Sequence, residues 1–98
     1  MDEGLLAILK DVVDPETGHS IVDMGLVYRA ERLGDTVEVD YTLTYLGCPI
    51  GDEIEESIVS NLKMRASAKD VIVRLVWTPR WTEDRMSEEL RLEYGYPI

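Results

Sequence analysis

Cys48 is the residue with the most distinctive chemistry, because it is the only cysteine among the 98 residues. The segment Gly47-Cys48-Pro49 lies between a predicted strand and a predicted helix, and the unpaired N–H groups of the helix start would face the thiol. That position favours the thiolate, the form that binds soft metals and attacks electrophiles. The carboxylates of Asp52 and Glu53 in the first helical turn act in the opposite direction, so the protonation state stays open. A lone cysteine can equally be a small buried hydrophobic residue.

Cys48 and the single histidine, His19, are too few to hold a metal by themselves. Structural zinc and iron–sulfur sites usually have four soft or borderline ligands, and the sequence contains no Cys-x-x-Cys or His-x-x-x-His pair. We therefore expect no resident cofactor in the isolated chain. Weak, transferable metal binding at Cys48, completed by a second chain, a partner or a small thiol, is compatible with the sequence. His19 is expected to be a solvated loop residue.

Three carboxylates fall in one predicted loop, at Asp14, Glu16 and Asp23. Together they could bind a hard cation or orient a thiol. The alternative is that Asp14 and Asp23 accept hydrogen bonds from N–H groups of turns or helix ends, which Asp does commonly. No general acid–base pair can be assigned among them without geometry.

Two tryptophans flank a proline in Trp77-Thr78-Pro79-Arg80-Trp81. Trp77 ends a predicted strand and is expected in the core. Trp81 beside Arg80 is a candidate contact with a partner protein, because exposed tryptophan and arginine often anchor interfaces. Packing of Trp81 against the last helix is the alternative. No nucleotide-binding glycine motif is present, so nucleotide chemistry has no support.

The composition excludes several classes of function. Asp and Glu number 20 against 10 Lys and Arg, a net charge of −10, which disfavours nucleic acids and anionic membranes as partners. The single cysteine suits a reducing compartment. The N-terminus does not resemble a signal peptide, and no apolar stretch is long enough to span a bilayer. We therefore expect a cytoplasmic protein.

The elements that must position these residues follow from apolar periodicity and turn residues. They are a helix over Leu5–Val13, a loop over Asp14–Gly25, strands over Leu26–Leu33 and Thr36–Thr44, a helix from Cys48 to about Arg65 with Pro49 in its first turn, a strand over Asp70–Trp77 and a helix over Met86–Tyr94. This order, α-β-β-α-β-α, predicts one α+β domain over residues 1–98, with a two-layer architecture and a small mixed sheet.

Alternation along the strands predicts which face each residue occupies. In the second strand Val37, Val39, Tyr41 and Leu43 share the buried face, and Glu38, Asp40, Thr42 and Thr44 share the solvated face. In the third strand the second face carries Ile72, Arg74 and Val76. Two apolar residues on a face that should be wet suggest a covered surface and a homodimer.

Taken together, several short segments resemble one protein family. They are Asp14-Pro15-Glu16, Ile21-Val22-Asp23-Met24-Gly25-Leu26-Val27-Tyr28, Thr42-Leu43-Thr44, Gly47-Cys48-Pro49, Asp52-Glu53-Ile54, Val76-Trp77-Thr78-Pro79-Arg80-Trp81 and Met86-Ser87. In this order and spacing the chain resembles the PaaD-like and SufT-like accessory domains of iron–sulfur cluster assembly, from about Leu5 to Tyr94. PaaD-like proteins typically carry a cysteine-rich C-terminal extension, whereas the only cysteine in this sequence is Cys48. The general assembly branch is therefore the better match.

The resemblance implies a fold similar to the C-terminal domain of NifU scaffold proteins and a role in maturing iron–sulfur proteins. The functional cysteine of the family falls on Cys48 and its acidic loop residue on Asp14. The implied cargo is a transient iron–sulfur cluster or iron, and the implied partners are assembly proteins and client apoproteins. Two alternatives stay open. One is a binding module that docks through the loops around Asp23 and Trp81, and the other is an enzyme with Cys48 as nucleophile, which is disfavoured because His19 is the only histidine available as a base.

Overall fold

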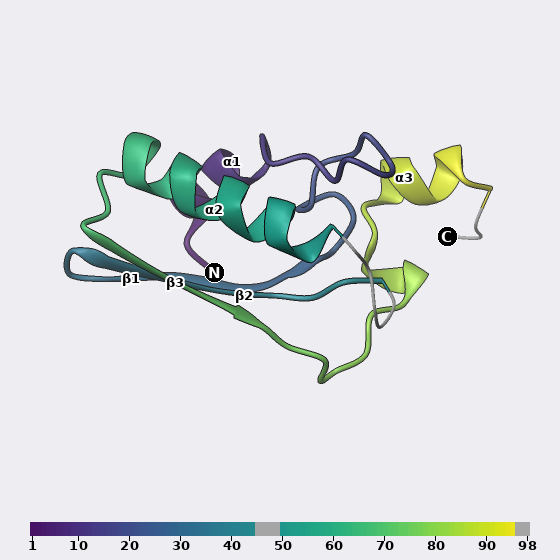
Figure 1. Ribbon diagram of the computed structural model, residues 1–98. Coiled ribbons are helices and arrows are strands. Elements are labelled where there is room, and N and C mark those ends of the chain that lie inside the picture. The colour runs from purple at the N-terminus through teal and green to yellow at the C-terminus, as the bar shows by residue number, and fades with distance from the viewer. Residues whose placement is uncertain (45–49, 96–98) are drawn as a thin grey trace.

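The described part of the chain forms three α-helices and a three-stranded sheet, with one short 3-10 turn. The computed structural model describes residues 1–44 and 50–95. In chain order the elements are α1 (Glu3–Leu9), β1 (Val27–Leu33), β2 (Thr36–Tyr41), α2 (Gly51–Arg65), β3 (Asp70–Leu75), the 3-10 turn η1 (Glu83–Arg85) and α3 (Glu88–Glu93) (Figure 1). The predicted α+β class and element order are confirmed.

The sheet is mixed, with strand order β1-β2-β3. β1 and β2 form an antiparallel hairpin in which Leu33 pairs with Thr36, and Gly34 in the turn has a φ of +65°, which suits glycine. β3 runs parallel to β2, from Asp70 beside Thr36 to Leu75 beside Tyr41. A parallel pair requires a crossover, and α2 provides it. The central strand is therefore β2, and β1 and β3 are the two edges.

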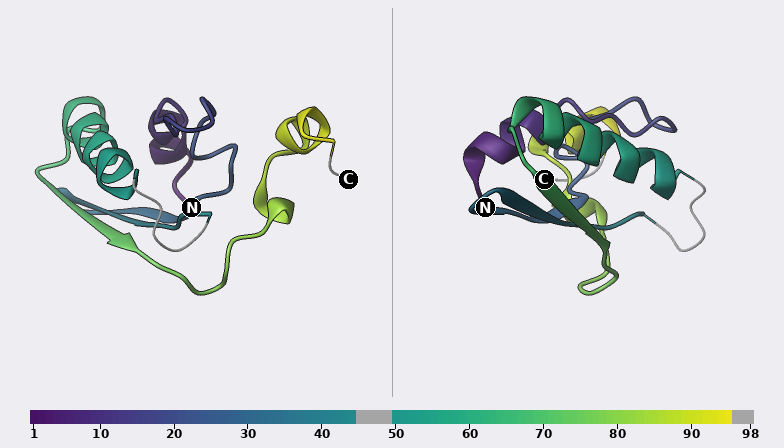
Figure 2. Two further views of the ribbon diagram at one scale, coloured as in Figure 1. Left: turned by 45° about the vertical axis from the view of Figure 1, so that its right-hand side comes forward. Right: turned by 60° about the vertical axis from the view of Figure 1, so that its left-hand side comes forward.

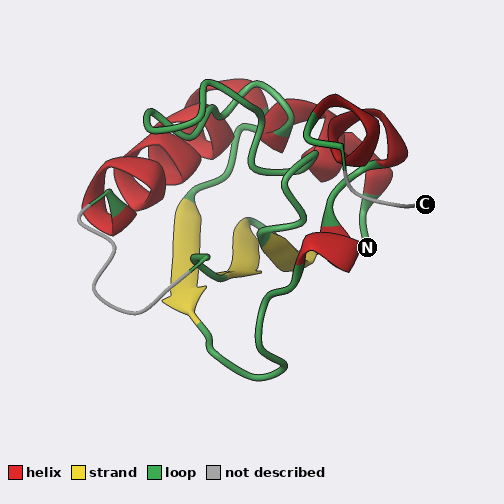
Figure 3. Cartoon of the chain, turned by 90° about the vertical axis from the view of Figure 1, so that its right-hand side faces the viewer, coloured by secondary structure: helices red, strands yellow, loops and turns green. Residues whose placement is uncertain are grey.

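The molecule has two layers, with the helices on one side of the sheet (Figures 2 and 3). α2 faces the sheet with Ile54, Ile58 and Leu62, which are buried and spaced by four residues. The strands pack against these residues with the face that alternation predicts. Its buried members are Val27 and Ala30 of β1, Val37, Val39 and Tyr41 of β2, and Leu43 just beyond. The predicted buried face of the second strand is therefore confirmed from Val37 to Leu43. The prediction of Thr42 on the solvated face is wrong, because β2 ends at Tyr41 and Thr42 beyond it is fully buried.

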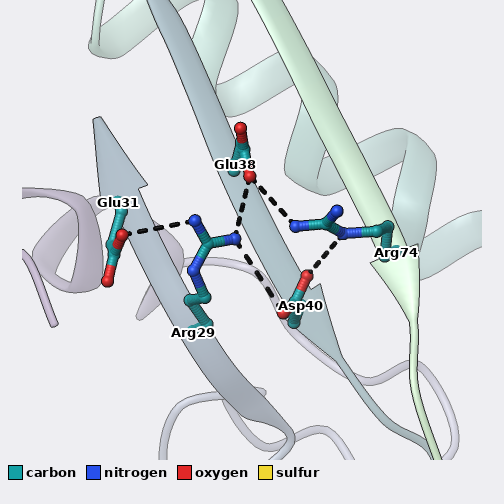
Figure 4. A network of polar contacts seen from close by, with 5 residues as sticks. All are labelled: Arg29, Glu31, Glu38, Asp40 and Arg74. Carbon is teal, nitrogen blue, oxygen red and sulfur yellow. Dashed lines mark hydrogen bonds and ion pairs between the residues drawn. The ribbon is translucent and has the colours of Figure 1, made fainter. Parts of the chain in front are cut away.

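The opposite face of the sheet carries a network of charged side chains (Figure 4). Arg29 of β1 contacts Glu31, Glu38 and Asp40, with nitrogen–oxygen distances of 3.2, 2.9 and 3.9 Å. Arg74 of β3 contacts Glu38 and Asp40, at 3.0 Å each. These five residues are called the sheet network below. Each guanidinium bridges carboxylates of β2, so the network joins all three strands on the face that the helices leave uncovered.

Several predicted boundaries are wrong. The first helix ends at Leu9 rather than near Val13, because Val13 instead forms an isolated bridge with Ser20. The third strand ends at Leu75, so alternation no longer applies to Trp77, which is 37% exposed and not in the core. The last helix begins at Glu88, where the Ser87 side chain accepts a hydrogen bond from the N–H of Leu90.

The predicted start of the second helix is also wrong. Its N-cap is Ile50 and its first residue is Gly51, so Pro49 precedes the cap instead of occupying the first turn. Sequence signals for a helix start are accurate only to a residue or two. Across the described ranges 1–44 and 50–95, no helix has the length and apolar character needed to cross a bilayer.

Candidate functional site

Cys48 lies in residues 45–49, which are outside the part of the chain that the structure describes. The described residues on either side are Thr44, which follows β2, and Ile50, which caps α2. The candidate site can therefore be built from these flanking residues, which are called the β2–α2 junction: Tyr41–Thr44 and Ile50–Glu55.

A buried tyrosine connects the two sides of the β2–α2 junction. Tyr41 is 1% exposed, and its hydroxyl donates a hydrogen bond to Oε2 of Glu55 at 3.0 Å. The hydroxyl oxygen of Tyr41 also lies 3.5 Å from the carbonyl oxygen of Gly51. Burial, together with the hydrogen bond to Glu55 and the charges of Glu55 and Asp52, raises the pKa of Tyr41 above its ordinary value. The phenol therefore stays a neutral donor, and it fixes the first turn of α2 to the end of β2.

Apolar packing holds the same ends together. Ile50 is 9% exposed and belongs to the core, as does Leu43. A Cβ atom added at Gly51 would lie 3.2 Å from Cδ1 of Leu43, so a residue with a side chain would fit there only with some displacement. Thr42 is fully buried, and its hydroxyl has no hydrogen-bond partner within the described residues. The frame on either side of Cys48 is thus closely packed.

The start of α2 combines opposite charges. Ile50 provides no side-chain hydrogen bond to the first turn, so the N–H groups of Gly51, Asp52 and Glu53 form the positive end of the helix without a capping side chain. Asp52 and Glu53 are exposed carboxylates in that turn. A thiolate, sulfide or other anion near the amides is favoured by them and opposed by the carboxylates. The predicted effect of Asp52 on the protonation of Cys48 stays a prediction.

Asp14 is buried in the loop between α1 and β1, at 4% exposure. Its Oδ1 accepts a hydrogen bond from the N–H of Glu16 at 2.8 Å, its carbonyl accepts from Gly18, and its N–H donates to the carbonyl of His19. These contacts are those of an Asx turn. The structure therefore provides the turn-forming role that was the alternative reading of Asp14.

The other predicted loop residues point to different neighbours. Asp23 lies 3.8 Å from Nζ of Lys10, and Nε2 of His19 lies 4.0 Å from Glu93 of α3. Glu16 is exposed. Among residues 1–44 and 50–95, no three His, Cys, Asp or Glu side chains lie close enough to hold a metal ion. Within these described residues, Asp14, Glu16 and Asp23 therefore do not come together as a cation site.

The two tryptophans differ in burial, and the prediction that Trp77 lies in the core is wrong. Trp81 is half-buried against the core, and its Nε1 donates a hydrogen bond to the carbonyl of Met24 at 2.7 Å. Trp77 and Arg80 are exposed. Trp81 therefore attaches the segment after β3 to the loop before β1. The exposed residues between β3 and Trp81 are the four that precede Trp81, 77–80.

The Tyr41–Glu55 contact is the part of the site that sequence reasoning missed. The alternation of β2 places Tyr41 in the core, and a buried tyrosine usually requires a partner for its hydroxyl. That signal predicts a partner without identifying Glu55, because the two residues come from different elements. The contact between Trp81 and Met24 has no sequence signal, since the acceptor is a backbone carbonyl.

Comparisons with known proteins agree on one family. Residues 2–75 match the model of the family described as iron–sulfur cluster assembly protein. The Fe-S protein maturation auxiliary factor YitW of Bacillus subtilis is 36% identical, over 97% of this chain and 94% of the relative. The auxiliary factor SufT of Staphylococcus aureus is 40% identical, over 86% of this chain and 97% of the relative. A solved domain from Bacillus anthracis, described as being of unknown function (DUF59), has a TM-score of 0.90 at 31% identity, covering 97% of this chain and 92% of that one.

Proposed function

The chain belongs to the iron–sulfur cluster assembly protein family, and we propose that its working group is the thiol of Cys48, which supplies one ligand to iron or a cluster in transit. The role in iron–sulfur protein assembly is that of an accessory factor, as in its named relatives. In the proposed mechanism the chain is a carrier rather than an enzyme, and its partners are assembly proteins and client apoproteins. A cytoplasmic location stays a prediction from the single cysteine.

The observation that supports this proposal is the closely packed frame on both sides of Cys48. Tyr41 joins the end of β2 to the first turn of α2, and Ile50 is buried directly before that turn. A ligand that must accept and release a metal is most useful when its attachment to the fold is rigid, because little ordering is then required at each transfer. The uncapped amides of α2 favour the anionic form of a nearby ligand.

The ligand count supports transfer over permanent storage. Cys48 is the only cysteine of the chain, and no cluster of metal-binding side chains exists in the described ranges. A cluster usually requires four ligands, so the remaining ones would come from a second chain, a client or a small thiol. Binding through one protein ligand is weak, and weak binding is what release to a client requires.

The test is anaerobic reconstitution with ferrous iron and sulfide, using wild-type protein, Cys48→Ser and the control Met64→Ser. Met64 is 80% exposed and lies near the other end of α2, so its replacement removes a sulfur atom without reaching the junction. We expect wild type and Met64→Ser to acquire iron and to restore an apo-ferredoxin. Cys48→Ser should lose both activities while its far-UV circular dichroism is unchanged.

Two results would contradict the proposal. Equal iron content and equal ferredoxin restoration for Cys48→Ser would show that the thiol is not a ligand. A thiol that reacts with iodoacetamide only after unfolding would show that it is inaccessible. In either case the alternative of a binding module without metal would be preferred.

The same family role requires a surface for assembly proteins or clients, and Arg80 and Trp81 remain the proposed contacts. Arg80 is exposed, whereas Trp81 is half-buried with its N–H bonded to Met24. Trp77, three residues before Arg80 in the chain, is 37% exposed and adds apolar surface to the same segment. A tryptophan next to an arginine is typical of interface anchors, so Trp77 joins the proposed contact surface.

A further inference from the structure

The edge of the sheet at β3 has backbone groups without partners among the described residues. The N–H of Asp70 and the N–H of Val76 donate to carbonyls of the β2 side, at Asp35 and Tyr41. Backbone groups alternate in direction along a strand, so the even-numbered residues of β3 bond to β2. The N–H and carbonyl groups of Val71, Val73 and Leu75 therefore point away from β2, toward the open edge. Such an edge is a template for a further strand.

The other edge of the sheet differs from this one. At β1 the carbonyl of Ala30 accepts a hydrogen bond from the N–H of Asp2 at 3.0 Å, and α1 starts immediately after it. The N-terminal segment thus occupies part of the β1 edge. Within the described residues, no comparable backbone hydrogen bond reaches the outward groups of Val71, Val73 and Leu75.

The sequence of β3 is complementary to itself when it is read in the opposite direction. Asp70-Val71-Ile72-Val73-Arg74 has an acid at one end, a base at the other and an isoleucine at its centre. In an antiparallel pair of two such strands centred on Ile72, each Asp70 lies opposite an Arg74. Cross-strand pairs of opposite charge stabilise a sheet, and like charges directly opposite one another destabilise it.

We propose that two copies of the chain associate through antiparallel pairing of their β3 strands, about a two-fold axis at Ile72. The pairing would extend the three-stranded sheets into one continuous sheet. Val71 of each copy would exchange backbone hydrogen bonds with Val73 of the partner subunit, because these are the residues whose groups face the edge. Ile72 would lie opposite its own copy in a pair without hydrogen bonds, where side chains approach most closely.

The side chains on both faces of the strand suit this arrangement. Ile72 is 45% exposed on the same face as Arg74, and Leu75 at the end of the strand is 41% exposed. On the helix side Val71 and Val73 are only partly buried. Pairing would bury more apolar surface on both faces. Asp70 is exposed, and Arg74 is half-exposed despite its contacts in the sheet network, so each can reach a partner.

A second copy is favoured over an extended segment of another protein by the charge order of the strand. An arbitrary peptide would gain the same backbone hydrogen bonds, but nothing in it would necessarily match Asp70 and Arg74 at once. A second β3 strand matches both by symmetry. Two-fold association of identical patches is also the commonest form of oligomer.

The first test is the mass of the protein in solution by analytical ultracentrifugation over a concentration series. We expect wild-type protein to approach twice the 11.2 kDa of one chain. Ile72→Lys places two ammonium groups opposite each other at the axis and should raise the dimer dissociation constant by at least about tenfold. The matched control is Leu33→Lys, at a 55% exposed position at the end of β1, and it should leave the dimer unchanged.

The second test fixes the register. In a background of Cys48→Ser, Ile72→Cys should form an intermolecular disulfide under mild oxidation, because residues opposite each other without hydrogen bonds lie about 4.5 Å apart at Cα. Leu33→Cys is the control and should not. Wild-type protein that stays monomeric at high concentration, or a dimer unaffected by Ile72→Lys, would overturn the proposal. A monomer that binds only an extended peptide at β3 would overturn the choice of a second copy.

Discussion

The hydroxyl of Tyr41 should stabilise the β2–α2 junction measurably, and Tyr41→Phe isolates its contribution. The substitution removes the 3.0 Å hydrogen bond to Glu55 and leaves the buried ring in place. A hydrogen bond to a charged group contributes about 1.5 to 3 kcal/mol. Glu55 is half-buried, so water replaces part of the lost contact, and we expect a loss of about 1.5 kcal/mol. For a domain of this size that corresponds to about 6 to 12 °C in the melting temperature.

Urea denaturation followed by circular dichroism measures this loss, with Tyr28→Phe as the control. The hydroxyl of Tyr28 is also buried but has no partner in the described residues, and its ring contacts Arg85, 4.4 Å from the ring centroid. Phenylalanine keeps that ring contact and removes an unsatisfied polar atom, so Tyr28→Phe should not destabilise the fold. Equal stabilities of the two variants would refute the assignment of the Tyr41–Glu55 contact as a stabilising tie.

The same contact predicts a pH dependence. Burial and the neighbouring Glu55 raise the pKa of Tyr41 above its ordinary value of 10.0. Below pH 10 both the folded and the unfolded chain hold the proton, so the contribution to stability is complete. As the pH rises above 10 the unfolded chain loses the proton first, and the free energy of unfolding falls. That fall should be smaller in Tyr41→Phe, and identical pH profiles would contradict the shift.

Two further pairs of variants test the packing around the loop before β1. Gly25 has a φ of +74°, and a Cβ atom there would overlap the carbonyl of Arg85, so Gly25→Ala should lower the free energy of unfolding by at least about 3 kcal/mol. Gly18 has a φ of +76° but open space around it. Gly18→Ala should therefore lower the free energy of unfolding only by the backbone strain, about 1 to 2 kcal/mol. Trp81→Phe loses the hydrogen bond to Met24 and should cost about 1 to 2 kcal/mol, whereas Trp77→Phe at an exposed site should change stability by less than about 0.5 kcal/mol. Denaturant unfolding measures both pairs, and equal effects within either pair would contradict the corresponding contact.

The sequence predicts the layers of this fold because its periodicities are strong. Val37, Val39 and Tyr41 alternate with Glu38 and Asp40, and a strand with one buried face leaves no other register. The apolar spacing of α2 likewise identifies the helix face that covers the sheet. These patterns are local, so they can be read without knowing which elements meet.

Long-range contacts are what the sequence does not specify. Asp14 looks the same in a sequence whether it binds a cation or closes a turn, and only the structure shows its Oδ1 accepting a hydrogen bond from the N–H of Glu16. Pro49 is a typical first-turn residue, yet α2 starts after Ile50. The partners of Tyr41 and Trp81 depend on how separate elements pack. The role of Cys48 stays a prediction from the family and from the residues that flank it.

The sheet network carries little of the net negative charge of the chain. Its three carboxylates and two guanidinium groups together carry a charge of −1, while the whole chain carries −10, so −9 belongs to residues outside the network. At physiological ionic strength, charges repel one another over about 8 Å. Two molecules that approach with their β3 edges foremost therefore bring two nearly neutral networks side by side, while most of the negative charge lies elsewhere on each chain. Electrostatic repulsion over this short distance thus orients the encounter of two acidic molecules just before their strands touch.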